Sequence, residues 1–552
     1  MRLGWALLIA VAGGLALAAA FPPAGIWPLA AAGPALLVVA LWRRSLRASF
    51  VVGLVFGIAF FTPLLSWLVN VAWYAWAALA MVEALVFGLL AIGQRLLLRL
   101  RAWPLAVAGW WVAAEAMRGR WPYAFPWGRL AMSQAGAPTA GWAAVGGAPL
   151  LSFLVALAGA TLAWLLIAPG RWPGPGGEPA APGRVPSSPG DPPSGSGTGP
   201  PGQRRERPGP VRRRAVPLLA LAGAMGLAVA GVVLPVDQPA PAAEATISAI
   251  QGDVPHARTL ASMLRASTVT ANHAVTTEGL AALVRSGARP APDLVVWPEN
   301  STDLDPALYP SIYAAITRAT SAIDRPVLVG SVLQNPLRNA GQLWLPRRGP
   351  VQVYVKRQLV PFGEYIPLRG FLDKFTSLPS LQPVNFTPGH KAVVFHTGKI
   401  RLGDVICYEV GFDQLVSSEV NAGANLLAVQ SNDADFELDG QTSESAQQLA
   451  MARIRAVESD RAVVYVSTTG ESAIIAPDGT IMVRSGIWQR AALEARVPLR
   501  SQLTLADRAG SWPEAAIAAL TLAALGWAAA GAFRAARRGT AAAAAGTPGL
   551  TD

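Results

Sequence analysis

The sequence predicts a polytopic α-helical membrane domain of about eight spans, joined to an α/β domain that lies outside the membrane. Two observations predict the membrane domain: 52% of the 552 residues are hydrophobic, and the mean hydropathy is +0.37. Soluble globular chains rarely have such a composition, whereas membrane proteins commonly do. The α/β domain is predicted from residues 240–505, where short β-rich runs alternate with helical stretches.

Eight windows are apolar enough to be candidate spans, although a full crossing needs about 20 residues. The window at 27–42 is short, and the window at 103–117 is interrupted by Glu115, so these two are the weakest. The first window is interpreted as an uncleaved anchor rather than a signal peptide, because a second apolar window follows almost at once. The windows are 3–20, 27–42, 49–70, 75–94, 103–117, 146–167, 216–234 and 512–532.

Arginine placement gives these spans an orientation. Basic residues cluster after the second, fourth, sixth and eighth windows, as at 43–47 and 95–101. Because basic residues concentrate in cytoplasmic loops, the pattern predicts that both termini are cytoplasmic. The α/β domain then lies on the outer face of a bacterial inner membrane. Arg118, Arg120 and Arg129, which follow the fifth window, do not fit this pattern.

The chain divides into six predicted segments. Residues 169–215 contain Pro, Gly, Ser and Arg in low complexity, without periodic apolar positions, which predicts a disordered cytoplasmic linker. The other segments are a membrane domain with spans one to six at 1–168, span seven at 216–234, the α/β domain at 240–505, span eight at 512–532 and a cytoplasmic tail at 533–552.

Seven short runs in the α/β domain are β-rich: "TISAIQ", "DLVVWPE", "PVLVGSV", "VQVYVK", "RLGDVIC", "NLLAVQ" and "AVVYVS". The stretch "SESAQQLAMARIRAVES" at 443–459 has apolar residues at intervals of three and four, which predicts a helix. "APDGT" at 476–480 predicts a tight turn that joins two strands.

Three of these runs end in polar residues of complementary chemistry. Glu299 ends "DLVVWPE", Lys356 ends "VQVYVK" and Cys407, the only cysteine, ends "RLGDVIC". Groups at the ends of different strands can converge on one site. A carboxylate can take a proton from a thiol, and an ammonium can stabilise the oxyanion that forms when a thiolate attacks an acyl carbon.

Each of the three residues also has a non-catalytic interpretation. Glu299 fits an exposed loop acid, Lys356 a solvated charge at a strand end, and Cys407 a small core residue. Taken one at a time, the residues favour these interpretations, and their spacing carries no mechanism. The local sequences around them decide the question.

Composition and motifs exclude several classes of function. The net charge is +12, but the basic residues lie beside apolar stretches and form no nucleic-acid-binding motif. A single cysteine forms no intramolecular disulfide. The four histidines make no H-E-x-x-H pair and the chain has no G-x-S-x-G elbow, so we expect neither a zinc site nor a serine hydrolase, and no cofactor.

Three motifs surround the candidate residues: "WPEN" (297–300), "YVKRQLVPFGEYIP" (354–367) and "CYE" (407–409). Together they resemble the nitrilase, or carbon–nitrogen hydrolase, superfamily, whose members use a Glu-Lys-Cys triad. The long middle motif, followed by "CYE", resembles the apolipoprotein N-acyltransferase family in particular. The resemblance implies that residues 240–505 form a nitrilase-like α-β-β-α sandwich.

The resemblance extends over nearly the whole chain except the linker and the tail. "AAEAMRGRWPYAFPWGRLAMSQ" (113–134) is similar to the family's E-x-x-R-G, F-P-W and S-Q segment. "SNDADF" (431–436) and "MARIRAVE" (451–458) resemble later motifs of the same family. Agreement in both halves makes chance similarity a poor explanation.

The resemblance implies a role for each matched residue. Glu299 corresponds to the general base, Lys356 to the lysine that stabilises the oxyanion, and Cys407 to the nucleophile. Glu364 corresponds to a second essential glutamate. The two residues beside the nucleophile, Tyr408 and Glu409, complete the implied active site.

The resemblance also implies the reaction and the partners. Cys407 would take an acyl chain from a phospholipid as a thioester, and the α-amine of a diacylglyceryl-cysteine on an apolipoprotein would then take it from the sulfur. A covalent intermediate means that the two bulky lipids need not be bound together. The protein is expected to work in the bilayer as a monomer, without nucleic acid.

Two positions depart from the family's pattern. Leu260 lies where the family carries a tryptophan on a loop over the site, and Asp435 replaces an aromatic residue in the usual N-D-A-W-F-G motif. The acidic stretch 433–444 spaces oxygen ligands like a calcium loop, but Leu438 occupies the position that needs glycine. A solvated loop is therefore the preferred interpretation of this stretch.

Two other functions compete with acyl transfer. A membrane-anchored nitrilase-type amidase or hydrolase would use the same triad and let water resolve the thioester, but it would not need the multi-span half. A transporter or scaffold would need polar groups inside its spans. Apart from Glu115, the predicted spans carry almost no charge, which argues against it.

Overall fold

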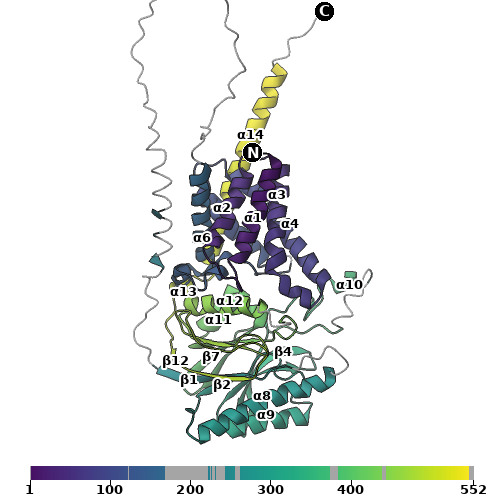
Figure 1. Ribbon diagram of the computed structural model, residues 1–552, viewed down its shortest axis with the longest axis vertical. Helices are drawn as coiled ribbons and strands as arrows, with labels where there is room; N and C mark the ends of the chain where they lie inside the picture. The colour runs from purple at the N-terminus through teal and green to yellow at the C-terminus, as the bar shows by residue number, and fades with distance from the viewer. Residues whose placement is uncertain are drawn as a thin grey trace, which may run out of the picture.

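The computed structural model describes residues 2–121, 123–167, 243–254, 262–372, 383–437 and 443–545, with isolated positions at 374 and between 222 and 231. Apolar helices gather at one end of the molecule and two β-sheets at the other (Figure 1). The predicted linker at 169–215, most of the predicted span at 216–234, and Leu260 lie outside the described residues.

The helical half contains close helix pairs that small residues permit. A Cβ added at Gly14 would lie 2.5 Å from the carbonyl oxygen of Phe56, and one at Gly53 would lie 2.4 Å from that of Phe87. Such small residues let apolar helices pack backbone to backbone. The elements are α1 (Leu3–Ala19), α2 (Leu29–Leu41), α3 (Leu46–Leu64), η1 (Ser66–Asn70), α4 (Trp73–Leu97), α5 (Trp103–Arg118), η2 (Leu130–Gln134), η3 (Pro138–Trp142), α6 (Ala143–Ile167) and, from the C-terminal part, α14 (Trp512–Ala545).

The prediction of about eight spans is not confirmed. Among the described residues, four helical segments are long and apolar enough to cross a membrane: Leu46–Leu64, Trp73–Leu97, Pro138–Ile167 and Trp512–Ala535. The apolar helices α1 and α2 are shorter, with 17 and 13 residues. At 1.5 Å per residue, α2 reaches only about 20 Å, because the apolar window that predicted it includes turns on either side.

Two six-stranded sheets form the other half of the molecule. The first has the order β12-β1-β2-β3-β4-β5 and the second the order β11-β10-β9-β8-β7-β6, and each contains three parallel strands in its middle. The strands are β1 (Ala243–Gln251), β2 (Leu294–Val296), β3 (Val327–Leu333), β4 (Arg338–Leu345), β5 (Gly349–Val355), β6 (Val394–Thr397), β7 (Ile400–Ile406), β8 (Leu426–Ser431), β9 (Val463–Ser467), β10 (Ala473–Ile475), β11 (Ile481–Arg484) and β12 (Ala491–Leu499).

Helices cover both outer faces of the sheet pair. The sheets meet through a shared apolar core that includes Leu294, Leu402 and Val464. α8 (Ser262–Arg285) and α9 (Pro310–Ile323) cover the first sheet, while α11 (Asp413–Asn421) and α12 (Glu444–Ser459) lie between the second sheet and the membrane helices (Figure 1). The result is the predicted nitrilase-like α-β-β-α sandwich. The remaining elements are α10 (Arg369–Leu372), η5 (Cys407–Gly411) and α13 (Leu505–Ala509).

All seven predicted strands are present, and so are the helix predicted at 443–459 and the turn at 476–480, which joins β10 to β11. The structure adds β4, β6, β10, β11 and β12, whose sequences carry weaker patterns. Periodicity identified the helix because one face of α12 packs on β9 and the other on the membrane half.

The sandwich contacts the membrane half through polar side chains as well as apolar ones. Gln447 on α12 donates hydrogen bonds to the carbonyl oxygens of Pro22, at 3.3 Å, and Leu64, at 3.0 Å. Asn70 donates to the carbonyl oxygen of Phe436, at 2.7 Å. The second sheet and its helices are therefore the side of the sandwich that is fixed to the membrane helices.

Candidate active site

Each of the three predicted strand-end residues follows a strand in one of the two sheets. Glu299 lies three residues after β2, Lys356 directly after β5, and Cys407 directly after β7. All three side chains are buried, with exposed fractions of 4%, 1% and 7%. The interpretations of Glu299 and Lys356 as solvated surface charges are therefore wrong.

The ammonium of Lys356 joins two carboxylates. Its Nζ atom lies 2.9 Å from Oε1 of Glu299 and 3.1 Å from Oε1 of Glu364. Asn339 reaches the same two oxygens, donating from Nδ2 at 2.6 and 2.7 Å. Lys356 and Asn339 therefore each bridge the two carboxylates through the same pair of oxygens.

Burial and charge set the protonation of this cluster. Burial alone would lower the pKa of Lys356, but the two adjacent carboxylates raise it well above its ordinary value, so the ammonium stays charged. Burial raises the pKa of Glu299, and the charge of Lys356 opposes that rise. A base with a raised pKa is better matched to accepting a proton near neutral pH.

Cys407 starts the 3₁₀ turn η5 with φ of +53°, a conformation that non-glycine residues seldom adopt. Such strain persists only where the surrounding structure imposes it, and it is typical of active sites. Burial, followed by the charge of Glu299, raises the pKa of the thiol well above its ordinary value, whereas Lys356 lowers it. These influences together favour the protonated thiol over the thiolate.

Glu409 connects the nucleophile turn, which is η5 and begins with the predicted nucleophile Cys407, to the end of β5, which Lys356 follows. Its carboxylate accepts hydrogen bonds from the backbone N–H groups of Ile406, at 2.8 Å, and Arg357, at 2.7 Å. The backbone of Gln358, at 3.1 Å, and the hydroxyl of Tyr354, at 2.8 Å, also donate to it. These bonds are the physical reason for a buried glutamate after Tyr408: it positions the turn, and its own oxygens are fully occupied.

Replacing Glu409 by glutamine is expected to destabilise the protein by roughly 2–5 kcal/mol, because an amide would face four donors with one acceptor oxygen. Thermal unfolding in detergent measures the loss. Glu278→Gln is the matched control, since Glu278 is partly exposed and lies 3.8 Å from Arg318 on the surface. Equal unfolding temperatures for the two variants would contradict the structural role of Glu409.

Tyr408 connects the nucleophile turn to the membrane half. Its hydroxyl donates to the carbonyl oxygen of Ala124, at 2.8 Å, and its ring stacks on Trp127, with centroids 5.6 Å apart and planes 15° apart. Both partners belong to the segment around the F-P-W motif. The similarity between 113–134 and a family motif thus corresponds to a direct contact with the turn that carries Cys407.

Sequence reasoning missed two polar residues of the site. Gln448 on α12 donates from Nε2 to Sγ of Cys407 at 3.5 Å and also contacts Glu444. Its Oε1 accepts from the hydroxyl of Ser431 at 3.1 Å. Asn339 on β4 is the second polar residue that the sequence did not predict. Both are neutral residues without a motif of their own, although Gln448 lies inside the predicted helix on a face that also carries small residues.

The interpretation of 433–444 as a solvated loop is wrong for three of the four acids that the structure describes in this stretch. Asp433, Glu437 and Glu444 are buried, while Asp435 is exposed. Ser431 donates to Asp433 at 2.5 Å, and the backbone of Ser445 donates to Glu437 at 2.7 Å. Residues 438–442, with Leu438 among them, lie outside the described residues.

The helical half is also more charged than the sequence analysis concluded. Glu83 on α4 is buried and pairs with Arg118, whose guanidinium also donates to the carbonyl oxygen of Trp127 at 2.6 Å. Arg120 pairs with Glu514 on α14. Two of the three arginines that did not fit the orientation pattern, Arg118 and Arg120, are therefore paired with carboxylates of the helical half.

Family models match both halves of the chain. Residues 13–161 match the apolipoprotein N-acyltransferase N-terminal domain, and residues 257–502 match the carbon–nitrogen hydrolase domain. The helical half and the sandwich thus each correspond to a recognised domain.

Relatives match over most of the chain. An apolipoprotein N-acyltransferase of Mycolicibacterium smegmatis is 37% identical over 91% of this chain and 82% of its own length. An apolipoprotein N-acyltransferase of Azotobacter vinelandii is 29% identical over 96% of this chain and 95% of its own length. With both halves matched and the strand-end residues gathered at one buried site, the chain belongs to the apolipoprotein N-acyltransferase family.

Proposed function

We propose that this protein moves an acyl chain from a membrane phospholipid to the α-amine of the diacylglyceryl-cysteine of an apolipoprotein, with Cys407 carrying the chain between them. The observation that supports this most directly is the position of the thiol. It lies next to a lysine–carboxylate cluster, on a turn whose next residue, Tyr408, contacts the membrane half.

In the first step, Glu299 takes the proton of the Cys407 thiol and the thiolate attacks the ester carbonyl of the phospholipid. The ammonium of Lys356, and the backbone N–H that follows the nucleophile, stabilise the oxyanion of the tetrahedral intermediate. The C–O bond to glycerol breaks, a thioester remains on the sulfur, and the lysophospholipid leaves with the proton from Glu299.

In the second step, the amine of the acceptor attacks the thioester. Glu299 now takes a proton from the nitrogen, an amide bond forms, and the C–S bond breaks. The sulfur regains its proton and the thiol is restored. Glu364 and Asn339 hold the side chains of Lys356 and Glu299 in position through both steps. Tyr408 and Glu409 hold the turn that carries Cys407 in place.

We propose further that the protein is a multi-pass, monomeric protein of the bacterial inner membrane, with the sandwich on the outer face and both ends in the cytoplasm. The start of α1 and the far end of α14 lie at the same end of the helical half, away from the sheets, which supports this orientation (Figure 1). α1, α2 and α5 would complete a bundle whose spans include α3, α4, α6 and α14. The segment boundaries predicted at 168, 215, 240 and 505 are retained in this proposal.

The decisive experiment is the intact mass of the purified protein after incubation with phosphatidylethanolamine and no acceptor. One added acyl chain is expected, because the chain has one cysteine. A diacylglyceryl-cysteine peptide should discharge the adduct, and water should do so only slowly. If no adduct forms, or if water clears it as fast as the peptide does, a membrane-anchored amidase or hydrolase is the better function.

A further inference from the structure

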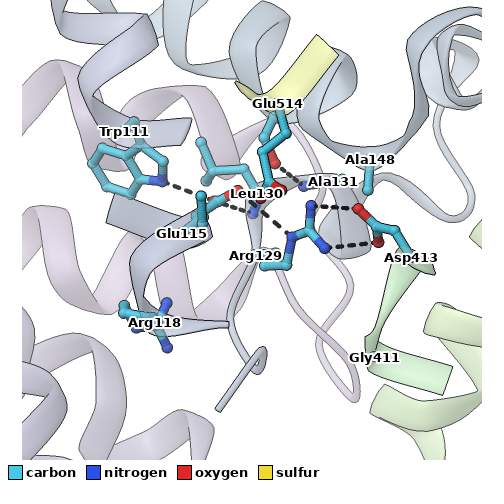
Figure 2. Close-up of polar contacts among 12 residues, drawn as sticks. Trp111, Glu115, Arg118, Arg129, Leu130, Ala131, Ala148, Gly411, Asp413 and Glu514 are labelled. Atoms are coloured by element: carbon cyan, nitrogen blue, oxygen red, sulfur yellow. Dashed lines mark hydrogen bonds and ion pairs between the residues drawn. The ribbon is translucent and has the colours of Figure 1, made fainter. Parts of the chain in front are cut away.

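A chain of charged side chains, all buried except the half-buried Asp413, crosses from the membrane half to the nucleophile turn. It runs from Glu115 on α5 through Arg129, Asp413 and Arg455 to Glu458 on α12. Figure 2 shows the guanidinium of Arg129 between Glu115 and Asp413. The Arg129 and Arg455 side chains are 7% and 0% exposed, whereas that of Asp413 is 22% exposed, so two buried guanidinium groups meet a carboxylate that is partly open to water.

Asp413 is the centre of this network. Arg129 binds it with both terminal nitrogens, Nη1 to Oδ1 at 2.7 Å and Nη2 to Oδ2 at 3.0 Å. Arg455 binds the same Oδ1 from the other side, at 2.6 Å. A bidentate guanidinium–carboxylate pair fixes orientation as well as distance, which a single point contact does not.

Arg455 also donates hydrogen bonds to the end of the nucleophile turn. Its Nε donates to the carbonyl oxygen of Val410 at 2.8 Å, and its Nη2 to that of Gly411 at 3.2 Å. Asp413 is the first residue of α11, two positions after the turn ends. Arg455 therefore connects the far end of the turn that begins with Cys407 to the carboxylate of Asp413, which Arg129 also binds.

On the membrane side, Arg129 belongs to a segment that α5 fixes. Glu115 accepts hydrogen bonds from the backbone N–H of Leu130 at 2.8 Å and from the indole of Trp111 at 3.0 Å, and its Oε2 lies 3.9 Å from Nε of Arg129. These contacts make one continuous connection between a membrane helix and the turn that carries the sulfur.

We propose that Asp413, clamped between Arg129 and Arg455, is a positioning residue that sets where the sulfur of Cys407 lies relative to the bilayer. The inference rests on the proposed function in one respect: it takes the acyl donor to be embedded in the membrane. Loss of the contacts between Asp413 and the two arginines would displace the sulfur of Cys407 relative to the bilayer. Reactions with partners in the bilayer then slow more than reactions with partners in water, because a displacement of about 1 Å can cost about 100-fold in rate.

The test compares two maleimides that alkylate the only cysteine, one water-soluble and one with a long alkyl tail that partitions into the bilayer. Proteins reconstituted in phosphatidylethanolamine vesicles are compared as wild type, Asp413→Asn and Arg129→Gln. The ratio of the tailed to the soluble alkylation rate is expected to fall about tenfold or more in both variants. Because the two residues act as one unit, the double variant should be no worse than either single variant.

Arg347→Gln is the matched control, since it also removes an arginine paired with a carboxylate, Asp324 at 3.2 Å, but it lies between β4 and β5 of the first sheet and not at the contact with the membrane half. It should leave the ratio unchanged. Arg129→Lys keeps the charge and loses the bidentate contact, so its ratio of alkylation rates should lie between those of Arg129→Gln and wild type. This variant provides the test if Asp413→Asn fails to fold.

An unchanged ratio in Asp413→Asn or Arg129→Gln, or an equal fall with both reagents, overturns the positioning role. Alkylation does not depend on acyl transfer, so this outcome is separate from a failure of the proposed function. That failure would appear as a wild-type protein that forms no acyl adduct from phosphatidylethanolamine.

Discussion

Cys407→Ala is expected to fold and to lose acyl transfer, with a fall in rate on the order of 10⁴-fold to 10⁶-fold. The thiol is the only group placed at the lysine–carboxylate cluster that can form a thioester, and alanine leaves nothing to carry the chain. Removing one small side-chain atom from the core is expected to cost little stability, about 1 kcal/mol. Formation of the N-acylated peptide, followed by mass spectrometry, measures the loss.

The uniqueness of the cysteine supplies a control for this variant. Because Cys407 is the only cysteine, a thiol reagent must label the wild-type protein once and the alanine variant not at all. A near-native unfolding temperature separates lost chemistry from lost folding. Substantial acyl transfer by the folded variant would contradict a mechanism through Cys407.

The second large effect is expected at Lys356. Lys356→Met should lower kcat by about 10²-fold to 10³-fold, the usual cost of losing one donor to an oxyanion. Lys356→Arg is also expected to be poor, because a planar guanidinium does not fit a confined site shaped for a compact ammonium. The side chain is only 1% exposed, so there is no solvent into which a larger group could turn.

Lys356→Met is expected to change the pH dependence as well. The positive charge of Lys356 lowers the pKa values of both Glu299 and Cys407, so its removal raises them. The base works only when it is deprotonated, and therefore the acid limb of kcat/KM must move to higher pH. A pH–rate profile of thioester formation measures the shift.

Lys399→Met is the control for this change. Lys399 also pairs with a carboxylate, Asp293 at 3.3 Å, but its side chain is about half exposed and far from the cluster in the fold. Its variant should keep both kcat and the acid limb of the wild type. An acid limb that does not move in Lys356→Met would contradict the coupling between Lys356 and Glu299.

The sequence predicted the strands that position the site because their signals are local. Each run that ends in Glu299, Lys356 or Cys407 is a strand or ends within three residues of one. The apolar residues before Glu299 and Cys407 are buried, whereas Val351 and Val353 before Lys356 are exposed because β5 is an edge strand. β4 was missed because polar residues interrupt its pattern. Asn339, which lies on that strand, was missed for the same reason.

The span count could not be predicted from composition alone. An apolar window does not distinguish a helix from an apolar turn, and only the backbone shows that α2 has 13 residues or that η1 follows α3. The amount of buried charge in the helical half was underestimated for a related reason. Glu83 and Arg118 are separated along the chain, and their pairing depends on how α4 and α5 pack.

The sequence by itself determined the two-part architecture, the strand-end residues and the family motifs, because hydrophobic pattern and short motifs are properties of neighbouring residues. Only the tertiary structure decided which side chains meet. Lys356 joins Glu299 and Glu364, Gln448 reaches the sulfur, and Arg129 pairs with Asp413 across the two halves. Those contacts link residues far apart in sequence, and their geometry depends on the packing of the whole fold.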